Sequence, residues 1–160
     1  MPEEEDFEGD NAYVSLLHGC SPQFWLYALL LGSRLKQLDG SRPRVLLVGR
    51  DLPGYPSPCL QGHAGLEALW QVRPVDLVDA SAADKTRWKR HRYVFTKLLA
   101  LEVPFRKIVF FDVDVIVRRS PAELFEIPAP AGMYHGPWAE RGFARHGQAL
   151  SAEAFSKAFV

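Results

Sequence analysis

The sequence predicts an α/β fold in which a mainly parallel sheet is flanked by helices, and two observations support this class. Short apolar runs that are typical of buried strands alternate with segments whose apolar residues recur at helical spacing. Ser-Pro pairs at 21–22, 57–58 and 120–121 mark helix starts, because serine caps a helix and proline fits its first turn. Strands and helices that alternate in this way favour a parallel, doubly wound sheet.

The first half of the chain is expected to supply three strands and two helices. The strands are predicted at residues 12–17, 44–49 and 74–79. The first helix should start at the Ser-Pro pair at 21–22, and "LEALWQV" should belong to the second. One face of the first helix is expected to pack on the sheet through Phe24, Tyr27, Ala28, Leu31, Leu35 and Leu38.

The second half is expected to continue this alternation. A basic stretch at residues 85–92 leads into a helix at 93–102, and an apolar strand follows at 107–114. A capping box should start another helix after Ser120, and a fifth strand is expected at 129–136. The apolar face of the helix at 93–102 is predicted to contain Val94, Leu98 and Leu101.

Composition limits the partners and the location that can be expected. The chain has 19 Lys and Arg residues against 19 Asp and Glu residues, so its net charge gives no case for a nucleic-acid partner or an anionic membrane. Its 160 residues suffice for one domain, predicted at residues 11–160 after a disordered acidic tail at residues 1–10. The longest apolar run, residues 24–32, is too short to span a bilayer, and the acidic start is unlike a signal peptide. We therefore expect no membrane segment and a cytoplasmic location by default, or a Golgi location if the full-length protein differs.

Two aspartates interrupt the apolar run "KIVFFDVDVIVRR", where ionised carboxylates are costly unless a cation compensates them. Residues two apart on a strand share a face, so Asp112 and Asp114 should point to the same side at the carboxyl end of the strand. Open α/β sheets bind ligands at that end, and carboxylate oxygens suit Mg²⁺ or Mn²⁺. In the alternative, the strand ends at Phe111 and both side chains cap the next loop in water. The apolar residues on both sides of the pair favour the metal site.

Four segments carry a resemblance to a known enzyme family. They are "NAYVSLLHG", "ALLLGSRLKQ", "VFTKLLALEVPFRKIVFFDVDVIV" and "SPAELFE". In this order they are similar to the opening strand, the first helix, the central helix with the D-x-D strand, and the following helix of the glycogenin-like retaining glycosyltransferases, family 8. The resemblance covers most of residues 12–136 and implies the GT-A fold, a Rossmann-like sheet that binds nucleotide-sugars.

The resemblance implies metal-dependent, retaining transfer of a hexosyl group from a UDP-sugar donor to an unknown carbohydrate or protein acceptor. It implies that Asp112 and Asp114 bind Mn²⁺, or Mg²⁺, which bridges to the diphosphate, and that Lys97 contacts the nucleotide-sugar. Helical spacing places Arg90 on the same stripe as Lys97, so both cations could face one anion. The uridine pocket corresponds to the end of the first strand and the start of the first helix. The residues expected to bind the nucleotide-sugar are Leu16, His18, Phe24, Arg90, Lys97, Asp112, Val113 and Asp114.

The later motifs of the family are not found in the sequence. These are an Asp-Gln pair near the reacting sugar and a His-x-x-Gly-x-x-Lys stretch that supplies a further metal ligand and a diphosphate clamp. We therefore expect an N-terminal fragment of the catalytic domain, with a sheet that is incomplete at its C-terminal side. The isolated chain is expected to be inactive.

Two other functions remain open from the sequence. An apolar strand that ends in D-x-D also opens the haloacid-dehalogenase-like phosphatases, in which Asp112 would be the nucleophile. Val115 stands where those enzymes usually have the glycine of a Gly-Thr pair. The chain could also be a non-catalytic module that binds a nucleotide-sugar or another anion, and the basic stretch at residues 85–92 would suit RNA or an acidic partner.

Overall fold

The computed structural model describes residues 8–19, 21–50, 63–79 and 93–132. The chain divides into two compact units, the first ending at Pro121 and the second starting at Ala122, and each is described by itself. The first unit contains the sheet and the predicted site. The single domain predicted for residues 11–160 stays a prediction.

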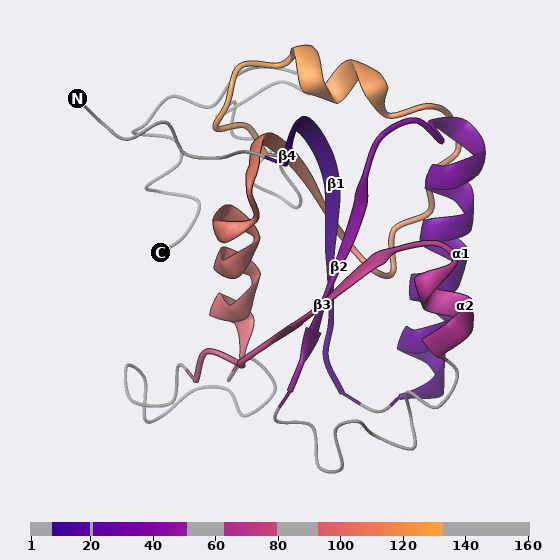
Figure 1. Ribbon diagram of the computed structural model, residues 1–160, viewed down its shortest axis with the longest axis vertical. Helices are drawn as coiled ribbons and strands as arrows, with labels where there is room; N and C mark the ends of the chain where they lie inside the picture. Colours follow the sequence, from indigo (N-terminus) through magenta and orange to yellow (C-terminus); the bar gives the residue numbers. More distant parts are fainter. Residues whose placement is uncertain (1–7, 20, 51–62, 80–92, 133–160) are drawn as a thin grey trace, which may run out of the picture. The chain divides into compact units, whose positions relative to one another are not determined.

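The first unit is built on a sheet of four parallel strands, which confirms the predicted α/β class (Figure 1). The strands are β1 (Gly9–Leu17), β2 (Arg44–Gly49), β3 (Gln71–Val75) and β4 (Phe105–Asp112). Their order in the sheet is β3-β2-β1-β4. The chain therefore moves from β1 outward to β2 and β3, and then crosses to the other side of β1 to form β4. The direction of winding reverses between β1 and β4.

Helices cover both faces of the sheet (Figure 1). Helices α1 (Pro22–Leu38) and α2 (His63–Glu67) contact each other, and α1 contacts β1. A 3₁₀ helix, η4 (Val94–Glu102), lies on the opposite face and contacts β1 and β4. The core on the η4 side joins alternate residues of β1 and β2 to Ala100 of η4. Those strand residues are Ala12, Val14, Leu16, Val45 and Leu47.

The packing of α1 depends on a glycine that faces a tryptophan. The indole of Trp70 donates a hydrogen bond from Nε1 to the Ala28 carbonyl oxygen, at 2.9 Å. A Cβ atom on Gly32 would lie 2.3 Å from that Nε1. Only glycine therefore lets the indole lie against α1 in this position. Ala28, Leu31 and Leu35 are buried as predicted, whereas Phe24 is exposed.

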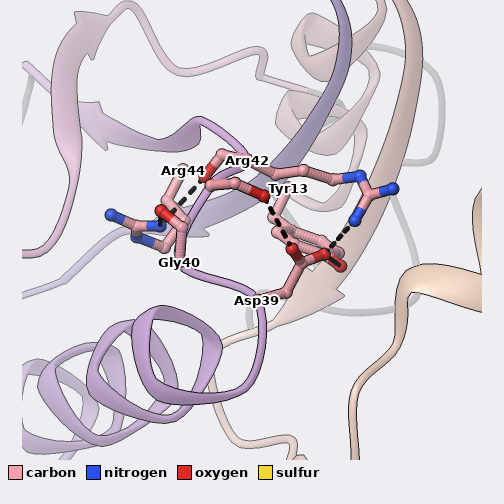
Figure 2. A network of polar contacts seen from close by, with 6 residues as sticks. Tyr13, Asp39, Gly40, Arg42 and Arg44 are labelled. Atoms are coloured by element: carbon pink, nitrogen blue, oxygen red, sulfur yellow. Dashed lines mark hydrogen bonds and ion pairs between the residues drawn. The ribbon is translucent and has the colours of Figure 1, made fainter.

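A polar network joins β1, the end of α1 and the start of β2 (Figure 2). The Tyr13 hydroxyl donates to Asp39 Oδ2 at 2.6 Å, and Arg42 pairs with the same carboxylate. Arg44 Nη1 donates to the Arg42 carbonyl oxygen at 2.9 Å and to the Gly40 carbonyl oxygen at 3.3 Å. Burial raises the pKa of Tyr13 well above its ordinary value, and the hydrogen bond to Asp39 adds to this. Burial alone would raise the pKa of Asp39, but the hydrogen bond from Tyr13 and the Arg42 guanidinium together hold it below its ordinary value.

Several predicted boundaries differ from the structure. Strand β1 starts at Gly9, inside the predicted tail at 1–10. Helix α2 ends at Glu67 and β3 is Gln71–Val75, so the predicted limits of the second helix and of the strand at 74–79 were wrong. Trp70, between them, donates its indole N–H to the Ala28 carbonyl oxygen and so packs against α1. Pro74 lies inside β3, where it is tolerated because β3 is an edge strand.

The predicted apolar face of the helix at 93–102 was also wrong. Val94, Leu98 and Leu101 are exposed, whereas Thr96 and Ala100 are buried. Thr96 and Ala100 are four residues apart, the same spacing as Val94 and Leu98, so the buried face of η4 is offset by two residues from the predicted one. It carries small side chains, which a pattern of large apolar residues does not indicate. The Thr96 hydroxyl accepts a hydrogen bond from the Val78 amide at 2.9 Å, which ties η4 to the segment after β3.

The described part of the second unit contains a short 3₁₀ helix, η5 (Ala122–Glu126), where the capping box predicted a helix. Residues 129–132 of the predicted fifth strand are not in a strand, and its remaining residues lie outside the described part of the chain. Among the described residues, no helix combines the length and the apolar character needed to cross a bilayer.

Candidate functional site

The candidate site lies where β1 and β4 end. The two strands are parallel neighbours, and Leu16 is the register partner of Asp112. Their carboxyl ends therefore meet at the same edge of the sheet, at the point where the winding reverses. Open α/β sheets place their ligands outside the carboxyl ends of the strands at such a point. The fold thus brings the two aspartates to the position where this class of sheet binds ligands.

The first aspartate ends a strand, and the second lies in the turn that follows. Strand β4 ends at Asp112, and the Val115 amide donates to the Asp112 carbonyl oxygen at 3.1 Å across the turn that follows. Asp112 and Asp114 are exposed, whereas Val113 between them is buried. The predicted strand at 107–114 was therefore too long, and Asp114 is placed by the turn rather than by strand alternation. Burial of Val113 holds the turn against the protein and leaves both carboxylates facing solvent.

Lys97 of η4 meets the first aspartate. Its Nζ lies 2.6 Å from Asp112 Oδ1 and 6.0 Å from the centroid of the Phe110 ring. Phe110 and Asp112 share a face of β4 because they are two residues apart, and this is the face that η4 covers. The structure therefore brings together two of the residues predicted for the site. The Lys97 side chain is 42% exposed and that of Asp112 is 51% exposed, so both remain open to solvent.

Polar side chains that the sequence did not single out hold the elements of the site. The buried Ser15 of β1 donates from Oγ to the Phe111 carbonyl oxygen at 2.8 Å, next to Asp112. Arg34 of α1 donates from Nε to the Val117 carbonyl oxygen at 3.3 Å, just after the turn. The signal for Ser15 was present, because it is a small polar residue between apolar residues of a predicted strand. The contact of Arg34 gave no signal, because it joins segments that are far apart in the sequence.

The remaining predicted residues have different settings. Leu16 is in the core, so the part of it that faces the site is its backbone beside Asp112. His18 is exposed and is followed by Gly19, whose φ of 85° favours glycine in the turn from β1 to α1. Phe24 lies in the first turn of α1 with its ring 6.1 Å from that of Tyr27, edge to face. Arg90 lies outside the described residues. Roles for these side chains in binding stay predictions.

The carboxylates can be compared with what a divalent cation needs. Within the described ranges, no group of three or more His, Cys, Asp or Glu side chains is arranged to hold a metal ion. Asp112 and Asp114 offer oxygen ligands on one exposed turn. Mg²⁺ is commonly held by one or two carboxylates, and water and substrate phosphates complete its shell. By their chemistry, the two aspartates fit such a cation. In this structure, however, one oxygen of Asp112 is paired with Lys97.

The chain is similar in sequence to parts of known proteins. No protein-family profile matches it. It is 28% identical over 119 residues to UDP-glucuronate:xylan alpha-glucuronosyltransferase 1 of Arabidopsis thaliana, covering 74% of this chain and 17% of that protein. It is 26% identical over 128 residues to UDP-glucuronate:xylan alpha-glucuronosyltransferase 2 of the same plant, covering 80% of this chain and 20% of that protein.

An uncharacterized protein of Acanthamoeba polyphaga mimivirus is 28% identical over 135 residues, which cover 81% of this chain and 46% of that protein. The chain therefore spans less than half the length of each of these relatives. Two of the relatives are glycosyltransferases by name. The resemblance to family 8 glycosyltransferases drawn from the sequence motifs is thereby confirmed: the chain is glycosyltransferase-like over 74% and 80% of its length in the two named matches.

Proposed function

We propose that this chain is the nucleotide-sugar-binding part of a metal-dependent, retaining glycosyltransferase that transfers a hexosyl group from a UDP-sugar. The observation that supports this best is the group formed by Asp112, Asp114 and Lys97 where β1 and β4 end. It combines two carboxylates with a cation at the edge where such a sheet binds ligands. A diphosphate bound through a divalent cation needs both kinds of charge.

Each residue of the group has a separate task in this proposal. Asp112 and Asp114 hold Mn²⁺ or Mg²⁺ through their carboxylate oxygens. The bound cation would supply Lewis-acid stabilisation of the charge on the departing UDP. Lys97 provides a positive charge to the diphosphate. Ser15 and the buried Val113 fix the backbone on either side of Asp112, so the carboxylates keep their positions when the ligand arrives.

The names of the relatives suggest which donor to test first. Both named enzymes carry UDP-glucuronate as the donor in their names. We take UDP-glucuronate as the first donor to test, with xylan as the first acceptor, and UDP-glucose as the comparison donor. The nucleotide half of these donors is the same, so binding of UDP itself tests the site before the sugar is known.

The decisive experiment measures UDP binding by calorimetry with Mn²⁺ and with EDTA. UDP should bind with Mn²⁺ and lose its measurable affinity in EDTA. Asp112→Asn should weaken the Mn²⁺-dependent binding at least about tenfold, since even groups that only support a metal ligand affect affinity on that scale. The matched control is Asp10→Asn, because Asp10 is an exposed carboxylate at the opposite end of the sheet, 3.6 Å from Arg106. Equal affinity for UDP in EDTA and in Mn²⁺ would contradict the proposal.

One feature also favours a phosphatase as a second candidate. Strand β4 ends at Asp112, whose carboxylate is half exposed, as a nucleophile at a strand end would be. Hydrolysis of p-nitrophenyl phosphate that Asp112→Asn abolishes and Asp10→Asn leaves intact would support this candidate. No hydrolysis by a chain that binds UDP with Mn²⁺ would remove it.

A further inference from the structure

The contact between Lys97 and Asp112 raises a conflict with the proposed metal site. The ammonium lies 2.6 Å from Asp112 Oδ1, which is direct ion-pair distance. A divalent cation bound by the same carboxylate would be a close neighbour of that ammonium. Two positive centres on one carboxylate repel each other, most strongly where water is partly excluded. The pair seen in the structure and a cation on Asp112 are therefore competing states.

The Lys97 side chain is suited to exchange one ion-pair partner for another. Its charge is compact and sits on a flexible four-carbon stem, unlike the planar guanidinium of arginine. The side chain is 42% exposed, so it can swing away without disturbing the core. The backbone beneath it is held, because the neighbouring Thr96 is fully buried and accepts the hydrogen bond from the Val78 amide. Exchange therefore needs a rotation of one side chain and no movement of η4.

A diphosphate would give the displaced ammonium a new partner. Lys97 extends over the Phe110 ring toward the end of β4, so an anion bound at this edge would lie within the range of its stem. We propose that Lys97 is an exchangeable counter-ion: it neutralises Asp112 in the ligand-free protein, leaves it when a divalent cation binds, and then pairs with the diphosphate. This inference rests on the proposed function. It adds that Lys97 weakens binding of the cation alone and couples cation binding to nucleotide binding.

The coupling has a measurable sign. Binding of the cation frees Lys97 for the diphosphate, and binding of the diphosphate draws Lys97 away from Asp112. Each ligand should therefore increase the affinity of the other, and by thermodynamic linkage the two factors are equal. The protein would avoid filling the site with a cation when no nucleotide is present.

The test measures Mn²⁺ binding to the 160-residue chain by the electron paramagnetic resonance signal of free Mn²⁺, with and without UDP. Lys97→Met should raise the affinity for Mn²⁺ alone by about two- to fivefold, the scale of a partly exposed ion pair. The factor by which UDP increases Mn²⁺ affinity should shrink in the same variant. Lys97→Arg keeps the charge and should leave Mn²⁺ affinity within about twofold of the parent. Lys97→Gln is a second neutral variant, and circular dichroism shows whether each variant folds.

Lys36→Met is the control for net charge, because it removes one exposed lysine of α1 that donates to the Ala68 carbonyl oxygen. It should change neither the affinity for Mn²⁺ nor the coupling. If Asp112→Asn abolishes Mn²⁺ binding but both neutral Lys97 variants bind Mn²⁺ as the parent does or more weakly, the exchange is overturned and the proposed metal site stands. If Asp112→Asn leaves Mn²⁺ binding unchanged, the metal site itself fails and the exchange fails with it.

Discussion

Replacing Gly32 with alanine should destabilise the protein, although the same change in an exposed helix stabilises it. Alanine is favoured over glycine inside a helix by about 1 kcal/mol. Here the new Cβ would lie 2.3 Å from Trp70 Nε1 and 2.7 Å from Cε2, where ordinary contacts start at 3.4 Å. Overpacking of this kind costs about 1–3 kcal/mol. Displacement of the indole also breaks its hydrogen bond to the Ala28 carbonyl oxygen, a net loss of about 1 kcal/mol.

The two costs exceed the gain in helix propensity, so the free energy of unfolding should fall by about 1–3 kcal/mol. Urea unfolding followed by far-ultraviolet circular dichroism measures this change. Ser33→Ala is the matched control, because Ser33 is the exposed neighbour on α1 and should stabilise the helix by a few tenths of a kcal/mol. In a Trp70→Leu background, Gly32→Ala should cost less, since the clashing atoms are gone. Stabilisation by Gly32→Ala in the parent chain would refute the packing described for α1.

Two further outcomes are expected. The pKa of Asp39 is lower in the folded protein than its ordinary value of 3.8. The unfolded chain therefore binds more protons than the folded protein at low pH, and the free energy of unfolding falls as the pH drops. Asp39→Asn should remove this part of the acid dependence of urea unfolding as the pH falls from about 5 through 3.8 and below, and an unchanged dependence would contradict the network in Figure 2. The 160-residue chain should bind UDP with Mn²⁺ without transferring sugar, because its sequence lacks the Asp-Gln pair and the His-x-x-Gly-x-x-Lys stretch expected to position the donor sugar and clamp the diphosphate. Release of UDP from UDP-glucuronate by a purified, monodisperse chain, lost in Asp114→Ala, would show that the chain is catalytically sufficient.

The elements of the fold were predictable where local signals and burial agree. Strand β2 was predicted with its observed limits, and α1 starts at the proline of its Ser-Pro pair. Strand β3 starts three residues before the predicted strand, directly after Trp70, whose packing against α1 is a tertiary contact that the sequence does not show. The order of the strands had no local signal at all. The order depends on which strands pair with β1, and the sequence alone did not indicate these pairings.

The candidate site was predictable in its residues and only partly in its geometry. The D-x-D pattern within an apolar run identified Asp112 and Asp114 as carboxylates at a strand end. It could not show that β4 stops at the first aspartate, because the turn is fixed by the burial of Val113. Lys97 was expected to face a phosphate, and its contact with Asp112 depends on how η4 crosses the sheet. The buried face of η4 was not predicted because it carries the small residues Thr96 and Ala100, whereas the larger Val94, Leu98 and Leu101 are exposed.

The arrangement gives a physical reason for each charge at the end of β4. An aspartate that only water solvates at a strand end would need no further explanation. Asp112, however, lies where the winding of the sheet reverses between β1 and β4, and it pairs with a lysine from the helix that covers the same face. The pair neutralises an exposed carboxylate in the ligand-free protein. The Lys97 ammonium also places a positive charge at the edge of the sheet where a diphosphate would bind in the proposed function. A site with the carboxylates but no lysine would favour a cation without a nucleotide, whereas a site with the lysine but no carboxylates would favour an anion without a cation. If the proposed function holds, the group of Asp112, Asp114 and Lys97 would favour binding of the cation and the nucleotide together, and this is what the Mn²⁺ titrations with and without UDP measure.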